Sequence, residues 1–425
     1  MYISTATESN VGNESTHCSL RQGRILLLSY AFPPMQVQMM PAVFKPMASL
    51  ARLGYEVDVV TASSFCKELP LDDSLLPLAQ STFASVTRLD PPGGLRGRLQ
   101  QRFNVLQRVP DLMAVLHQPT YEHLMDLDLT RYDAVMTWSP FHSVNAAMAR
   151  VKKHRRNIRW IAQFSDPWAG NPLEINRLCK LWNIWHEPET VAAADWIVHS
   201  SPYSLELMFR GNRQGLRAKT GVLPHVFHSE LYPARPKTSD AQIVMRYVGV
   251  LYGRRSPEPV FAALGNVFAR RPELRGQLVV EIVGLVPPEM LQTAAAQALP
   301  QGTIRTVGTV GYMESLRLMH DADILLLIEA DVRRNLFLAS KVSDYIGAGA
   351  PIVGVVPPGA SEETMRELGA WYAAPRDIAG IERALEGAID HVLVGTGRPW
   401  WNESFRRTLS GEYVARQFSD IIRES

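Results

Sequence analysis

The feature that most constrains the fold is an unbroken aliphatic run, Ile324 to Ile328, which precedes a short helical pattern and a second apolar run that opens at Pro351. A continuous apolar run of this length is typical of a strand buried on both faces. Ser340 is a favourable residue for the start of the intervening helix, and Gly347 and Gly349 indicate its end. The pattern predicts a strand, a helix and a strand in succession, which is typical of parallel α/β sheets.

The predicted helix carries a lysine, Lys341, in its first turn. This is the positive end of the helix dipole, where a cation is disfavoured by up to ~1 kcal/mol. A phosphate held by Lys341 and by the free N–H groups of that turn would convert this penalty into an attraction. Asp344 shares a helix face with Lys341 and could accept hydrogen bonds from sugar hydroxyls. A solvated Lys–Asp pair on an ordinary helix is the alternative interpretation.

A second loop of the same character follows the predicted strand at residues 243–248. It contains Gly249, Gly253, Arg254 and Arg255, just before a Ser-Pro pair that is typical of a helix start. The glycines allow the backbone to approach a ligand closely, and the planar guanidinium groups suit phosphate oxygens. In an open parallel sheet both loops would lie at the carboxyl ends of strands, where such sheets bind ligands.

Residues 344–351, DYIGAGAP, resemble part of the donor motif of a known family, the retaining glycosyltransferases of the GT-B fold known as the family-four group. These enzymes use nucleotide-sugar donors. The resemblance puts Asp344 where a ribose-binding glutamate would be, and Ser340 with Lys341 matches a Ser-Lys form of the motif. The first of the family's two motif glutamates falls at Leu336, so that half of the motif is missing.

The resemblance continues in the other loops. It assigns the family's basic phosphate contacts to Arg254 or Arg255. Near the amino terminus, a predicted strand at residues 24–30 leads into the loop Ala-Phe-Pro-Pro and then a helix, as in the family's first unit. The family usually has a glycine pair after this Phe-Pro-Pro segment, whereas residues 35–40 contain no glycine.

Further strands are predicted at residues 134–138, 160–163 and 196–199, and each is followed by a polar or proline-bearing turn. These turns would ring one edge of the first sheet. Asp166, in an Asp-Pro-Trp turn, is the leading candidate to orient or deprotonate an acceptor hydroxyl. Its alternative role is an Asp-Pro turn that caps the next segment. His142 could contact the donor sugar, or it could cap its own helix.

The length and rhythm of the chain indicate two domains. A disordered leader is expected first, because the initial residues are polar and lack the basic start and apolar core of a signal peptide. The final helix is expected to cross back onto the first domain, as the resemblance implies. The expected divisions are 1–22 for the leader, 23–224 for a Rossmann-like acceptor domain, 225–241 for a linker, 242–399 for a nucleotide-sugar donor domain and 400–425 for the returning helix.

Composition excludes several classes of protein. The apolar fraction of 46% and charged fraction of 20% are those of a globular protein. A net charge of +2 argues against an extended nucleic-acid surface. The chain has 3 cysteines, too few and too scattered for a disulfide framework or a zinc site, which favours a reducing cytoplasm. No apolar run reaches the ~18 residues of a membrane span.

Two local patterns bear on partners and cofactors. Residues 94–108 contain four arginines, no acids and apolar residues at helical spacing. Such a segment could contact an anionic membrane peripherally, which would suit a lipid-linked acceptor, or it could pack on the first domain. Asp321 and Asp323 form an Asp-x-Asp sequence, but their position at a strand start favours a cap. No metal or other cofactor is therefore expected.

We therefore predict two doubly wound, Rossmann-like α/β domains that face each other across a cleft. The expected activity is transfer of a sugar from a UDP- or GDP-linked donor to an acceptor glycan or lipid-linked sugar, as in surface polysaccharide or glycolipid synthesis, with retention by resemblance. Lys341 and Arg254 (or Arg255) would stabilise charge on the leaving diphosphate. The alternatives are a nucleotide-sugar epimerase of the same fold and a non-catalytic sugar-nucleotide-binding scaffold.

Overall fold

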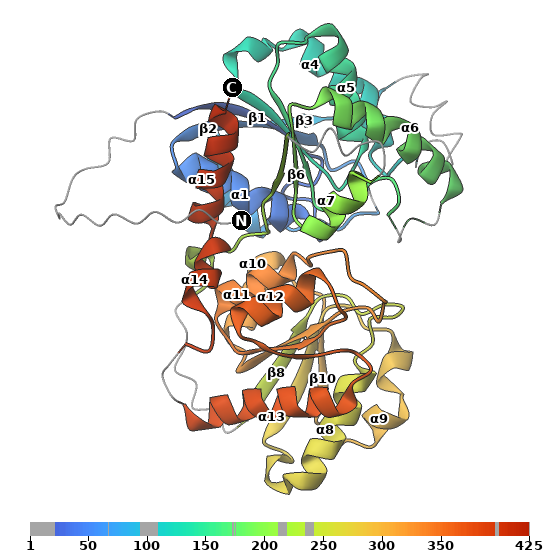
Figure 1. Cartoon of the computed structure of the whole chain (residues 1–425), viewed down its shortest axis with the longest axis vertical. Coiled ribbons are helices and arrows are strands. Elements are labelled where there is room, and N and C mark those ends of the chain that lie inside the picture. The colour runs from blue at the N-terminus through green and yellow to red at the C-terminus, as the bar shows by residue number, and fades with distance from the viewer. Residues whose placement is uncertain are drawn as a thin grey trace, which may run out of the picture.

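The protein was analysed as a computed structural model that describes residues 22–66, 68–93, 109–171, 174, 176–210, 219–233, 242–395 and 399–424. These residues form two α/β domains, each built on one parallel sheet, that lie one above the other in Figure 1. The predicted fold class is confirmed. The predicted leader, apart from its last residue, and the basic segment 94–108 lie outside the described residues.

The first domain has a parallel sheet of 7 strands in the order β3-β2-β1-β4-β5-β6-β7. Its strands are β1 (Gly23–Leu28), β2 (Tyr55–Ala62), β3 (Ser85–Leu89), β4 (Ala134–Trp138), β5 (Trp160–Phe164), β6 (Trp196–His199) and β7 (Thr220–Val222). Its helices are α1 (Met40–Arg52), α2 (Leu76–Thr82), α4 (His117–Asp126), α5 (Ser143–His154), α6 (Arg177–Ala193) and α7 (Pro202–Met208). The strand order reverses between β1 and β4, which creates a crevice at the carboxyl ends of those strands.

The second domain repeats this plan with 6 strands in the order β10-β9-β8-β11-β12-β13. Its strands are β8 (Ile243–Val248), β9 (Leu278–Val283), β10 (Ile304–Gly308), β11 (Ile324–Ile328), β12 (Ile352–Val355) and β13 (Trp371–Ala373). Its helices are α8 (Glu258–Arg270), α9 (Ala294–Gln297), α10 (Tyr312–His320), α11 (Lys341–Ala348), α12 (Ala360–Leu368) and α13 (Ile378–Val394). Here the order reverses between β8 and β11, which are the strands that precede the two predicted phosphate loops.

The central strands are buried because helices cover both faces of each sheet. In β11 every residue is buried, as its aliphatic sequence predicts. One apolar cluster continues from the first domain into the second, since Val43 and Met47 of α1 belong to the same cluster as Val342 and Ile346 of α11. No helix among the described residues combines the length and the apolar character needed to cross a membrane.

The carboxyl edges of the two sheets face each other. Ser204 of α7, just after β6, donates a hydrogen bond of 2.9 Å to the carbonyl of Leu336, in the segment between β11 and α11. In the same segment, Ser340 donates to the carbonyl of Gln38, in the loop after β1. Ser340 stands at the N-cap position of α11, but its side chain makes no capping bond. The helix thus starts where the sequence predicts, but the Ser340 hydroxyl is used across the domain interface and not in a capping bond.

The end of the chain returns to the first domain, as predicted, but through two helices, α14 (Glu403–Thr408) and α15 (Gly411–Arg423). The break falls at Ser410, whose side chain accepts a hydrogen bond from the backbone of Tyr413 and caps α15. Phe418 of α15 packs against Trp138 with ring centroids 5.7 Å apart. Figure 1 shows α15 in red beside α1 of the first domain.

The segment predicted as a linker is packed into the structure where it is described. Val226 and Phe227 are buried, and Phe227 exchanges backbone hydrogen bonds with Leu409 and Gly411. Residues 225–233 therefore belong to the junction between the domains, and residues 234–241 lie outside the described part of the chain.

Candidate active site

The amino end of α11 meets the loop after β8, so the two predicted phosphate loops come together. The Lys341 ammonium lies 3.0 Å from the hydroxyl of Tyr247 and 4.4 Å from the centre of that ring. A side-chain carbon at Gly249 would lie 2.3 Å from the Lys341 Nζ, and the φ angle of Gly249 is +141°. Only glycine therefore leaves space for the ammonium at this position.

The surroundings of Lys341 decide whether its side chain is charged near neutral pH. Burial lowers the pKa of its ammonium to about 7, with a further lowering by the charge of Arg255 and an opposing effect from Glu329. A cation that has lost most of its water is stabilised strongly by an anion placed against it. The site thus has the property expected of a position that is completed by a negatively charged ligand.

Arg255 is held by a carboxylate from the neighbouring strand. Its Nη2 lies 2.9 Å from Oε2 of Glu329, and the two side chains are only 14% and 5% exposed. Glu329 directly follows β11 and also accepts a hydrogen bond from Ser361. The Nε of Arg255 is buried without a partner among the described residues. Glu329 was not singled out from the sequence. A carboxylate immediately after a predicted buried strand could have identified it, because parallel sheets bind ligands at the carboxyl ends of their strands.

Arg254 and Gly253 form the tip of the same loop. Gly253 has a φ angle of +53°, and the turn closes through a 2.9 Å hydrogen bond from the backbone of Arg255 to the carbonyl of Tyr252. The Arg254 side chain is exposed and has no ion pair with any described residue. Of the two arginines, Arg255 is fixed by protein contacts and Arg254 is available to a ligand.

Asp344 lies in the interface between the domains. Its Oδ1 is 2.6 Å from the ammonium of Lys45 on α1 and accepts a 2.9 Å hydrogen bond from Tyr312. Asp344 is 5% exposed, and Lys341 has its own contact with Tyr247. The alternative of a solvated Lys–Asp pair is therefore wrong. The second oxygen of Asp344, Oδ2, makes no hydrogen bond to any described residue.

Asp166 lies at the facing edge of the first domain, directly after β5. Burial raises the pKa of its carboxyl group to about 6. Within the described part of the chain the carboxylate has no hydrogen-bond or ion-pair partner and caps no helix. Its place at this edge and its raised pKa are properties expected of a general base.

His142 follows β4 and stacks on Trp168, with centroids 4.5 Å apart and planes 10° apart. Burial lowers the pKa of its ring to about 3, so the imidazole is neutral at physiological pH. The expectation that His142 caps its own helix is wrong, because its side chain makes no capping bond. Asp111 takes that role by accepting 2.9 Å hydrogen bonds from the backbone and the hydroxyl of Ser143.

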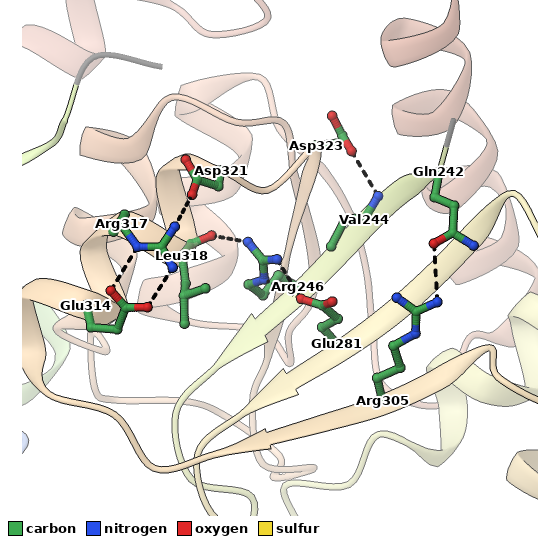
Figure 2. A network of polar contacts seen from close by, with 10 residues as sticks. All are labelled: Gln242, Val244, Arg246, Glu281, Arg305, Glu314, Arg317, Leu318, Asp321 and Asp323. Carbon is green, nitrogen blue, oxygen red and sulfur yellow. Dashed lines mark hydrogen bonds and ion pairs between the residues drawn. The ribbon is translucent and has the colours of Figure 1, made fainter. Parts of the chain in front are cut away.

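The Asp-x-Asp sequence has structural partners (Figure 2). Asp321 pairs with Arg317 at 2.6 Å, one helical turn earlier. Asp323 accepts a 2.9 Å hydrogen bond from the backbone of Val244 in β8. These two carboxylates therefore hold α10 and β8 in place, and Asp321 stands at the C-cap position of α10.

A surface cavity of about 390 Å³ lies elsewhere, at the junction of α1, the segment after β7 and α15. Its lining includes Ser49, His228 and Ser410 and none of the candidate site residues. It belongs to the packing of the returning helix rather than to the facing sheet edges.

No protein-family model matches the sequence, and no curated protein matches it either. Solved structures do match its fold. A glycosyltransferase from Rickettsia africae has a TM-score of 0.63 at 10% identity, over 95% of this chain and 99% of that one. The chain has the GT-B fold. Anabaena HepE in complex with UDP and glucose has a TM-score of 0.63 at 14% identity, over 95% and 100% of the two chains. Sucrose-phosphate synthase from Thermosynechococcus elongatus has a TM-score of 0.62 at 15% identity, over 95% and 98%.

Proposed function

We propose that this protein is a glycosyltransferase that moves a sugar from a nucleotide-sugar donor to an acceptor hydroxyl. One observation carries the proposal. Lys341 sits at the amino end of α11 directly against Gly249, beside a loop that presents a free Arg254 and a fixed Arg255. Cations, helix N–H groups and close backbone approach are the features that bind a diphosphate. Structures of the same fold hold UDP and UDP-glucose, which supports this choice of ligand.

In the proposed reaction, the bond from the sugar to the β-phosphate breaks and a bond to the acceptor oxygen forms. Negative charge then grows on the leaving diphosphate, and Lys341 with Arg254 stabilises it. Glu329 keeps Arg255 in position, and the free Oδ2 of Asp344 binds a ribose hydroxyl. The acceptor proton passes to Asp166, whose pKa of about 6 suits a base at neutral pH.

Other parts of the proposal rest on resemblance or on pattern. Retention of the anomeric configuration and a hexose donor linked to UDP or GDP come from the resemblance to the family-four group. His142, which stacks on Trp168, would line the donor sugar. No metal is required in this scheme, because protein cations and the end of α11 supply the positive charge. We place the activity in the cytoplasm, acting on a glycan or a lipid-linked sugar.

A nucleotide screen tests the proposal. Thermal shift and calorimetry with UDP, GDP, dTDP, CMP and NAD, each with and without EDTA, would identify the base, since a ligand of the native state raises the melting temperature. We expect stabilisation by one diphosphate that EDTA does not abolish and that Lys341→Ala removes. Lys153→Ala, a surface lysine on α5, is the matched control and should retain the effect. Stabilisation by no nucleotide would contradict the proposal.

A non-catalytic scaffold is the second candidate, and a specific observation favours it. The position of the first motif glutamate is Leu336, whose carbonyl is bonded to Ser204 across the interface. A scaffold would bind the nucleotide, lose that binding in Lys341→Ala, and turn over no donor with any acceptor. An epimerase of this fold would instead convert the nucleotide sugar with no acceptor present.

A further inference from the structure

Helix α6 carries an exposed apolar face on the first domain. Leu178, Leu181, Ile184 and Trp185 are 47%, 55%, 56% and 78% exposed. Their spacing of three, three and one residues puts them on one side of the helix. Figure 1 shows α6 projecting at the outer edge of the first domain, at the right of the view. A contiguous apolar face in this position indicates an interaction surface.

The opposite side of α6 is bound firmly to the domain. Glu187 is 1% exposed and accepts a 2.6 Å hydrogen bond from the backbone of Ala169. Asn183 accepts a 2.8 Å hydrogen bond from the indole of Trp168. The helix is therefore anchored through buried polar contacts, and its apolar outer face is not a consequence of loose packing.

The charges on α6 define the kind of surface it fits. Arg177 and Lys180 are exposed, and each lies within one turn of the apolar side chains. Of the two acids of the helix, Glu187 is buried, and Glu189, one turn after Trp185, has its charge paired with Lys153 of α5. On the outer face, leucine, isoleucine and tryptophan thus lie beside charges that, where they have no ion pair among the described residues, are cations. That combination is typical of a helix that lies in the interface of a membrane with anionic lipids.

We propose that the outer face of α6, formed by Arg177, Leu178, Lys180, Leu181, Ile184 and Trp185, docks on an anionic lipid surface. A second copy of the chain fits this face less well, because a symmetric contact would bring the cations of both copies together. The surface differs from residues 94–108, which the sequence suggested for membrane contact, and it uses none of them.

Docking through α6 would bring the lipid surface close to the candidate base. Trp182 of α6 packs against Trp168 with centroids 5.9 Å apart, and Trp168 stacks on His142. Trp168 is two residues from Asp166. A lipid-linked acceptor would therefore reach Asp166 over a short path. This assignment of the acceptor class rests on the proposed function, whereas membrane binding itself does not.

Vesicle flotation with the whole chain tests whether the outer face of α6 binds lipid. We expect binding to vesicles of phosphatidylcholine mixed with phosphatidylglycerol, weaker binding in high salt, and little binding to phosphatidylcholine alone. The variant Leu181→Glu/Trp185→Glu should lower the affinity about tenfold or more. The matched control, Leu393→Glu/Val394→Glu, changes two adjacent exposed side chains of α13 that are 52% and 69% exposed, and it should bind like the wild type.

Several outcomes would overturn the proposal that α6 docks on lipid. The proposal is contradicted if the wild-type protein floats with neither kind of vesicle. It is also contradicted if Leu181→Glu/Trp185→Glu floats like the wild type. A large fall in melting temperature in that variant would show that the chain itself covers the face. A change in its sedimentation coefficient would indicate contact between copies. The nucleotide thermal shift should be the same in this variant and in the wild type, so loss of vesicle binding with intact nucleotide binding separates this inference from the proposed function.

Discussion

The Lys45 ammonium and the Asp344 carboxylate form an ion pair between the two domains, with Nζ and Oδ1 2.6 Å apart and the side chains 2% and 7% exposed. Tyr312 donates to the same oxygen, and Ser343 accepts from Lys45. The residue that the resemblance assigns to ribose binding therefore joins the second domain to α1 of the first. In the proposed function, one side chain thus serves both the orientation of the domains and the binding of the donor.

Removal of one partner should destabilise the protein strongly. In Lys45→Met, Asp344 would be a buried charge without its cation, which typically costs about 3 to 5 kcal/mol. Denaturant unfolding should show a loss of this size in the free energy of unfolding. Lys153→Met breaks an exposed ion pair with Glu189 and should cost less than about 1 kcal/mol. Equal effects in the two variants would mean that the buried pair contributes no more than the surface pair.

Donor affinity should depend on the protonation of Lys341. Its pKa of about 7 means that the ammonium is charged below that pH and is increasingly neutral above it. Because the charged form binds the diphosphate, the dissociation constant should rise as pH increases, by up to tenfold per unit above the pKa. Calorimetric titration with the nucleotide across this pH range measures the dissociation constant. Arginine keeps its charge at all these pH values. If Lys341→Arg binds the nucleotide, its dissociation constant should therefore not change with pH. The same pH dependence in Lys341→Arg would assign the effect to another group.

Gly249→Ala should abolish diphosphate binding without unfolding the protein. The added carbon would lie 2.3 Å from Lys341 Nζ and displace the ammonium. Gly276→Ala is the matched control, because its φ angle of +78° is also positive and no atom lies within 4 Å of the new carbon. Both variants should lose a few degrees in melting temperature, and only Gly249→Ala should lose the nucleotide-induced shift. Retention of that shift would show that Lys341 needs no contact with this loop.

Asp166→Asn should separate donor binding from transfer. The nucleotide thermal shift should be unchanged, while transfer should fall about 10² to 10⁴-fold. In the wild type, transfer should decline as pH falls below about 6, because the carboxylate is then protonated and cannot accept the acceptor proton. The residual activity of Asp166→Asn should lack this acidic limb. An unchanged rate in the variant would remove Asp166 from the mechanism.

Sequence patterns predicted the features of the fold that depend on residues close together in the chain. The strand β11 follows from the burial of its aliphatic run, and the bounds of α11 follow from the helix-end preferences of Ser340 and Gly349. The contacts of Asp344 were not predictable in this way, since Lys45 lies 299 positions away in the sequence. Asp111 caps α5 from 32 positions away for the same reason. Such pairs depend on how finished elements pack, which local propensity does not encode.

Helix α15 has a consequence for how the protein is made. Its hydroxyl contact from Ser419 to Tyr55 and the packing of Phe418 on Trp138 complete the first domain with nearly the last residues of the chain. Domains usually fold in turn as they leave the ribosome. Here the first domain must wait, with this side of α1 uncovered, until α15 has been made. The first domain, although its strands are made first, is thus completed only after the strands of the second domain have been made.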